Sequence, residues 1–182
     1  MSQTDWAILA VMAVASIGGI PLAAQDAGPR DSLPHDAANH GAHHDPAAGD
    51  SAFADLQRRG AQVMGVDQYR SAHRFDALPD GGRIELQSLT GDTADVARIR
   101  RHFRDIQEAF IAGDFSGPFE VHAGTVPGTD LMASREDRIR YTRRDLPRGA
   151  ELRLTTTDPE VVRAIHEFLA FQRGDHRAAG RE

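Results

Sequence analysis

The sequence predicts an α+β fold: two ββα units form one antiparallel sheet, with two helices packed on one face. Two observations carry this. The stretches GGRIELQSLTGDTADVARIRRHF and RGAELRLTTTDPEVVRAIHEFL share a turn glycine, alternating apolar residues, an acidic cap and a helix with a similar apolar stripe. Each follows another alternating segment that can pair with it across a short turn. The uncovered sheet face is expected to be solvated and charged.

Residues 1–24 are expected to be a secretory signal, because residues 6–24 carry no charge and end in small residues. An uncleaved N-terminal anchor is the alternative, since the uncharged run is just long enough to cross a bilayer and no Lys or Arg precedes it. We therefore expect a periplasmic or secreted protein that touches a membrane only if this segment stays uncut. The chain has no cysteine, so its fold depends on its core rather than on disulfides.

Residues 25–50 are predicted to be a disordered linker, because they lack aromatic side chains and contain a single leucine. Four tether histidines lie in it: His35, His40, His43 and His44. Such His-rich tracts can bind metal weakly, although the histidines can equally be incidental parts of a solvated tether.

Residues 51–176 are predicted to fold as a single domain. It opens with a short helix over residues 51–59, capped by Ser51 and stopped by Gly60. Strands follow at residues 72–78 and 83–89, joined by a turn at residues 80–82. The alternation along the first strand places His73 on the apolar face.

The next element is a helix capped by Asp92 and ending at Gly113. Its apolar residues recur every three or four positions, at Val96, Ile99, Phe103, Ile106 and Phe110. His102 flanks this stripe and is expected at its rim. Residues 114–137 are expected to be irregular apart from a short strand at 119–122. Met132 is therefore expected in a loop, as is Met64 before the first strand.

The second unit is predicted to have strands at residues 138–144 and 151–155, joined by a turn over residues 146–149. Asp158 and Pro159 open the last helix, which ends at Gly174. Its buried stripe is expected to comprise Val162, Ile165, Phe168 and Leu169. Residues 177–182 read as a polar tail.

Composition argues against several classes of function. The formal net charge is −6 and no basic run occurs, so nucleic acid is not an expected partner. The motifs G-x-S-x-G, G-x-x-x-x-G-K and H-E-x-x-H are absent from the sequence. An enzyme here would be of an unrecognised type, and a non-enzymatic role is favoured.

Soft and imidazole ligands offer the most concentrated chemistry in the chain. Thioether and imidazole together suit Cu(I), which leads to the hypothesis that Met64, His73, His122 and Met132 bind copper or a similar transition metal for storage, delivery or sensing. Auxiliary ligands would be the tether histidines together with His166, expected to be exposed, and His176. In the alternative interpretation each methionine fills a gap in the core and each histidine is simply hydrogen-bonded.

A second hypothesis concerns the uncovered sheet face. It would carry the arginines and carboxylates Arg74, Arg83, Arg138, Arg140, Arg153, Asp76, Glu85 and Glu151. This face would dock an acidic partner, such as another envelope protein, or its charges would simply pair across strands.

The segments RRGAQVMGVDQ, AHRF, VH at 121–122, VPGT followed by Met132, DRIRYT, TTTDP and AIHEFLAFQRGDH resemble an uncharacterised family of small exported bacterial proteins. The likeness spans residues 53–176 and implies export and one compact domain. Arg74 replaces the second histidine of a pair in that pattern, which puts in doubt a site needing both. Some members are automatically labelled aspartate carbamoyltransferase. That label is not supported, because such an enzyme is larger, has two α/β domains and carries an S-T-R-T loop, to which Ser134-Arg135 is the nearest approach here.

Overall fold

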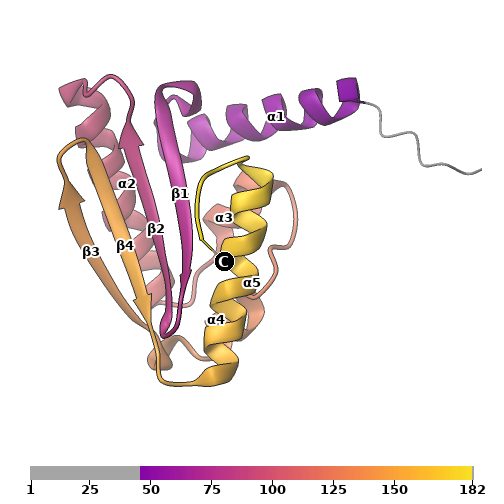
Figure 1. Cartoon of the computed structure of the whole chain (residues 1–182), viewed down its shortest axis with the longest axis vertical. Helices are drawn as coiled ribbons and strands as arrows, with labels where there is room; N and C mark the ends of the chain where they lie inside the picture. The colour runs from indigo at the N-terminus through magenta and orange to yellow at the C-terminus, as the bar shows by residue number, and fades with distance from the viewer. Residues whose placement is uncertain (1–45, 182) are drawn as a thin grey trace, which may run out of the picture. The chain divides into compact units, whose positions relative to one another are not determined.

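The computed structural model describes residues 46–181, and these residues have the predicted α+β architecture. Four antiparallel strands form one sheet in the order β1-β2-β4-β3 (Figure 1). The elements are α1 Pro46–Met64, η1 Gln68–Arg70, β1 Ser71–Leu78, β2 Gly81–Ser88, α2 Thr93–Ile111, α3 Ser116–His122, α4 Thr129–Ser134, η2 Glu136–Arg138, β3 Arg140–Leu146, β4 Gly149–Thr155 and α5 Pro159–Asp175.

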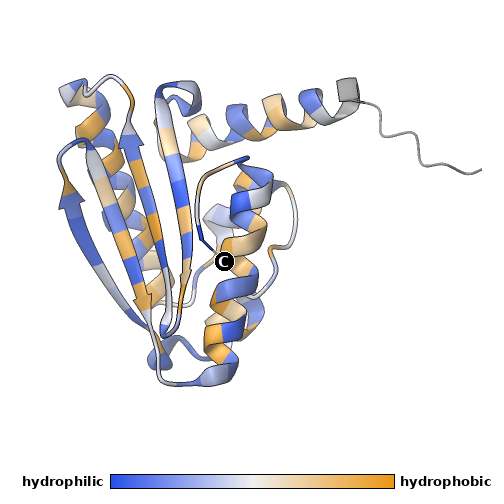
Figure 2. Ribbon diagram, viewed as in Figure 1, coloured by the Kyte–Doolittle hydropathy of each residue, from blue (hydrophilic) through white to orange (hydrophobic). Residues whose placement is uncertain are grey.

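The strand register places the alternating apolar residues on one face of the sheet, as predicted. Ile84 of β2 pairs with Phe75 of β1 and with Leu152 of β4. These side chains pack in one core with residues of α2 and α5, and Figure 2 shows the alternation along β2 and β4. His73 pairs with Leu86, which is fully buried, so the imidazole lies on the helix-covered face.

Helices α2 and α5 begin where the acidic caps predict. The Asp92 side chain accepts hydrogen bonds from the Ala94 and Asp95 amides at 3.0 and 3.1 Å, and α2 starts at the next residue. Asp158 caps α5 in the same way. One residue of the predicted α5 stripe differs, because Val161 rather than Val162 is fully buried.

Gly82 allows α5 to pack closely against the sheet. The hairpin turn lies at residues 79–80, so both Gly81 and Gly82 belong to β2 rather than to the predicted turn. A Cβ added at Gly82 would lie 2.1 Å from Cδ1 of Leu169, a distance that no real contact shows. The glycine therefore sets the distance between β2 and the last helix.

The strand predicted at residues 119–122 was wrong, because these residues belong to helix α3. Asp114 accepts a hydrogen bond from the Ser116 amide at 2.8 Å, and Pro118 occupies the first turn, where a proline is tolerated. Met132 lies in helix α4 rather than in a loop, and its side chain is fully buried. The region predicted to be irregular is thus largely helical.

Helix α1 is longer than predicted in both directions. Residues 46–50, assigned to the linker, are helical, and Gly60 lies inside the helix rather than stopping it. Gly65, with a φ of +66°, follows the last turn instead. Met64 is therefore the last residue of α1, not a loop residue. The predicted signal, residues 25–45 of the linker and the tether histidines lie outside the described residues.

The end of the chain is more than a polar tail, because it pairs with the free edge of β1. The amides of Phe75 and Ala77 donate to the carbonyls of Ala179 and Arg181, both at 2.9 Å. This pairing covers an edge that would otherwise expose backbone donors. No helix within residues 46–181 is both long enough and apolar enough to cross a membrane.

Candidate functional site

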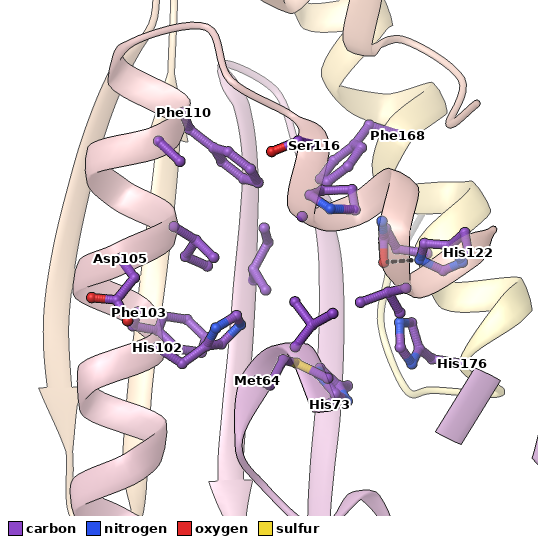
Figure 3. Close-up of a pocket in the computed structure, with 18 of the residues that line it drawn as sticks. Met64, His73, His102, Phe103, Asp105, Phe110, Ser116, His122, Phe168 and His176 are labelled. Carbon is purple, nitrogen blue, oxygen red and sulfur yellow. Dashed lines mark hydrogen bonds between the residues drawn. The ribbon is translucent and has the colours of Figure 1, made fainter. Parts of the chain in front are cut away.

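A cavity of about 250 Å³ lies between the sheet, the end of α1, and helices α2, α3 and α5 (Figure 3). Most of its wall is apolar. The larger apolar side chains are Phe75, Ile84, Phe103, Ile106, Phe110, Val121 and Phe168. A concave, mostly apolar site with a few polar groups is typical of a binding site.

Four imidazoles line this histidine cavity: His73, His102, His122 and His176. The His176 ring centre lies 4.7 Å from that of His73 and 5.1 Å from that of His122. His73 also stacks on Phe75, with ring centres 5.5 Å apart. Three imidazoles from β1, α3 and the end of α5 therefore form a continuous row along one wall.

Burial keeps most of these imidazoles uncharged at neutral pH. Loss of solvent lowers the pKa of His102 to about 4. Loss of solvent, and then the neighbouring His122, lowers the pKa of His176 to about 4. Burial and the surrounding imidazoles hold the pKa of His73 well below its ordinary value. A neutral imidazole keeps one ring nitrogen with a free lone pair, which can bind a metal or accept a hydrogen bond.

His122 is held by two partners. Its Nδ1 atom donates to the carboxylate of Asp175, and its Nε2 atom lies 3.0 Å from Oε1 of Gln172. The side chain is only 2% exposed, and both ring nitrogens are engaged. Both ring nitrogens of His122 face protein groups, so its role in the present arrangement is to shape the row rather than to bind.

His176 is in the opposite situation. Its Nδ1 atom is buried and has no hydrogen-bond partner. An unpaired buried polar atom costs free energy, which a bound ligand would recover. Among the imidazoles that line the cavity, His176 therefore gives the clearest sign of a ligand.

A polar hollow lies on the other side of His73 and His176. It is lined by Gln57 and Gln68 among others, and both glutamines are buried. The Oε1 atoms of these two side chains have no hydrogen-bond partner. The His73–His176 pair therefore separates an apolar cavity from a polar one.

The structure brings three of the four predicted metal ligands to one cavity. Met64, His73 and His122 line it, and the predicted auxiliary ligand His176 joins them. Met132 is not among the lining residues, because α4 buries it elsewhere in the core. His102, expected only at the rim of its helix, is the residue that sequence reasoning missed. Its position beside the buried Phe103 was the available signal.

His166 has a different role from the one predicted. It is half-buried rather than exposed, and its Nε2 atom donates to the carbonyls of Leu78 and Gly81 at 2.9 and 3.0 Å. The imidazole thus ties α5 to the β1–β2 turn. It does not line the histidine cavity.

Within residues 46–181, no three His, Asp or Glu side chains form a ready-made metal cluster. Comparison with protein-family models, curated proteins and solved structures finds no match to this chain.

The uncovered sheet face, here called the outer face, carries Arg74, Asp76, Arg83, Glu85, Arg140, Arg144, Glu151 and Arg153. The prediction that Arg138 lies on it was wrong, because Arg138 belongs to η2, which precedes the sheet strand. Most of its charges pair within the chain. Asp76 accepts hydrogen bonds from Arg74 at 3.0 Å and from Arg83, while Glu151 accepts one from Arg144 at 3.0 Å. Such pairing is expected if the charges of this face pair with one another across strands rather than dock a partner.

Proposed function

We propose that this domain binds a soft, monovalent transition metal ion, Cu(I), through the thioether of Met64 and the imidazoles of His73 and His176. The single observation that carries the proposal is the buried, unpartnered Nδ1 atom of His176, in a cavity that the other two residues also line. The two ring centres lie 4.7 Å apart. With metal–nitrogen bonds of about 2.0–2.1 Å, two imidazoles on one tetrahedral ion place their centres about 5 Å apart.

The protonation state of these histidines favours metal binding. An imidazole must be neutral to bind a metal, and burial keeps His73 and His176 neutral by lowering their pKa values. His122 would support the pair, because Asp175 and Gln172 fix its ring beside His176.

The surroundings favour a soft ion of low charge. Transferring a divalent ion into an apolar cavity costs more than transferring a monovalent one, unless carboxylates neutralise it. The two carboxylates that line this cavity, Asp105 and Asp114, belong to exposed residues at its mouth. Thioether and imidazole ligands select Cu(I) among the common metals. Such a site suits storage, delivery or sensing.

The test is a Cu(I) competition titration against bicinchoninate under anaerobic conditions. The full chain is used with the tether histidines His35, His40, His43 and His44 replaced by alanine, so that only the domain binds. We expect Met64→Leu and His176→Asn each to weaken the affinity at least tenfold, and X-ray absorption to report sulfur and nitrogen neighbours.

Met132→Leu is the matched control, because Met132 is the other methionine of the domain and lies outside the cavity. It should leave the affinity unchanged. Equal losses for Met64→Leu and Met132→Leu would overturn the proposed ligand set. Binding no tighter than that of a peptide with the sequence of residues 35–44 would overturn the function itself.

The proposal includes export to the periplasm or the medium, supported by the uncharged N-terminal run. Mass spectrometry of protein purified from the cell envelope tests it by reporting a mature N-terminus near Ala24. Docking through the outer face is the weaker alternative, since Asp76 and Glu151 already pair with arginines there.

A further inference from the structure

We infer that the apolar wall of the histidine cavity, which includes Phe103, Phe110 and Phe168, binds a single-ring aromatic molecule that carries no negative charge. This inference does not rest on copper binding. It concerns a different part of the same cavity wall and a different class of ligand.

The size of the cavity fits such a molecule. Its volume is about 250 Å³. Apolar cavities of about 150 Å³ already hold benzene and stay dry without it. The cavity here can therefore take a substituted ring, whereas a large polycyclic cofactor would require the wall to move.

The wall offers aromatic edges and faces to a bound ring. Phe110 and Phe168 meet edge to face, with centres 6.1 Å apart and planes at 86°. A third ring, Phe103, comes from the same helix as Phe110 and is almost completely buried. Aromatic pairs favour such offset and edge-to-face contacts, so a ligand ring gains more here than an aliphatic chain of equal area.

One polar group of the ligand would have a partner. His102 lines the cavity and forms an edge-to-face contact with Phe103, with ring centres 5.9 Å apart. In Figure 3 its ring points into the cavity from α2, whereas the carboxylate of Asp105 points away. A hydroxyl group on the ligand could donate to the free nitrogen of His102, which favours a phenol over a plain hydrocarbon.

The mouth of the cavity selects against anions. Asp114 and Ser116 line the cavity and are exposed, so an entering molecule passes the carboxylate of Asp114, while that of Asp105 points away (Figure 3). A carboxylate on the ligand would be repelled there and would also lose its hydration inside the apolar cavity. Neutral aromatic molecules meet neither barrier.

The experiment measures binding of toluene, phenol and benzoate to the metal-free full chain by ¹H–¹⁵N NMR titration and thermal unfolding. We expect toluene and phenol to bind with a Kd of roughly 0.1–1 mM, a range typical of ligands with so few atoms, and to raise the unfolding midpoint. Phenol should bind more tightly than toluene, and His102→Leu should remove that preference. Benzoate should bind at least tenfold more weakly than phenol.

Ala109→Leu fills the cavity from its α2 side, and Ala97→Leu is the matched control on the exposed side of the same helix. We expect toluene binding to fall at least tenfold in the first variant and to stay unchanged in the second. Ile106→Phe provides a second filling variant if Ala109→Leu unfolds. Toluene binding that survives both filling variants, or that is missing from the wild type, overturns the inference. His176→Asn should lose copper but keep toluene, so failure of one proposal is distinguishable from failure of the other.

Discussion

The two faces of the sheet bury polar groups in opposite ways. On the outer face, Asp76 is only 1% exposed, yet Arg74, Arg83 and the amide of Arg181 all donate to its carboxylate. On the inner face, His176 is largely withdrawn from water and its Nδ1 atom has no partner. The Asp76 carboxylate and its arginines satisfy one another and serve the fold, whereas Oε2 of the neighbouring Glu151 has no hydrogen-bond partner. The Nδ1 atom of His176 has lost water without gaining a partner, which is the condition of a binding site, although His122 beside it keeps two partners.

The pKa values report the same difference. Burial alone would raise the pKa of the Asp76 carboxyl, but hydrogen bonds from Arg74 and Arg83 outweigh it and hold that pKa below its usual value. Burial dominates for His102 and His176, each with a pKa of about 4. A lowered carboxyl pKa marks a charge with partners, whereas a lowered histidine pKa marks a group that stays neutral for lack of them.

The largest effect is expected from breaking the outer face at its centre. Asp76→Ala should lower the free energy of unfolding by about 3 kcal/mol at pH 7, because Arg83 and the Arg181 amide lose a shared acceptor. Urea unfolding measures this. Asp80→Ala is the control: its carboxylate pairs with Arg153 but is 58% exposed, so its loss should be under about 1 kcal/mol.

The pH dependence of that difference follows from the lowered pKa of Asp76. The carboxylate stabilises the fold above its unfolded pKa of about 3.9, and this contribution disappears as the pH falls through the lower folded value. The gap between the wild type and Asp76→Ala should therefore be full at pH 7 and shrink below about pH 4. Equal stability of the two proteins at pH 7 would contradict the account of the outer face.

The next effect concerns the inner face in mild acid. An unfolded histidine binds a proton near pH 6.5, whereas folded His102 and His176 do so only near pH 4. The unfolded state then binds more protons below pH 6.5, so the free energy of unfolding should fall by about 1–2 kcal/mol per histidine between pH 7 and pH 5. Asp76 stays ionised in this interval. Urea unfolding at three pH values measures the slope.

His102→Leu sharpens this prediction by removing one of the histidines whose pKa burial lowers. Its stability should fall less steeply between pH 7 and pH 5 than that of the wild type. A wild-type profile that is flat over this interval would show that the imidazoles are not held neutral.

A smaller effect is expected from the pair formed by His122, which lines the cavity, and Asp175, whose carboxylate is partly exposed. Asp175→Asn removes the charged partner of His122, and should destabilise the fold by about 1 kcal/mol at pH 7, because the carboxylate is 43% exposed. Thermal unfolding measures it, with Asp137→Asn at an exposed site as the control. A loss of stability as large as that expected for Asp76→Ala would show that the His122–Asp175 pair stabilises the fold as strongly as the buried pairs of Asp76.

The smallest effect is expected at the rim of the outer face. Arg144→Gln removes a partner of Glu151, but the arginine side chain is 66% exposed, and Glu151 keeps Arg83 at 3.7 Å. The midpoint of thermal unfolding should therefore not change measurably. A clear drop would show that the outer pairs act as one network rather than as separate contacts.

Much of the fold followed from local patterns. Asp92 and Asp158 mark the starts of α2 and α5, and the two-residue period puts His73 on the inner face. Residues 46–64 and 114–137 were predicted poorly. Gly60 looked like a helix stop but packs against Met64 and Gln68, and residues 119–122 looked like a strand but continue a helix opened by Asp114. At residues 46–64 tertiary contacts outweighed weak local preferences, whereas at residues 114–122 the local bond from the Ser116 amide to Asp114 favours the helix.

The candidate site divides in the same way. The types of ligand could be read from the chain, and so could the side of the strand on which His73 lies. Which distant residues meet could not, because periodicity fixes the face of one element and says nothing about where the end of another lies. Only the packing of α1, α3 and the end of α5 brought Met64, His122 and His176 to the cavity, and only α4 took Met132 away from it.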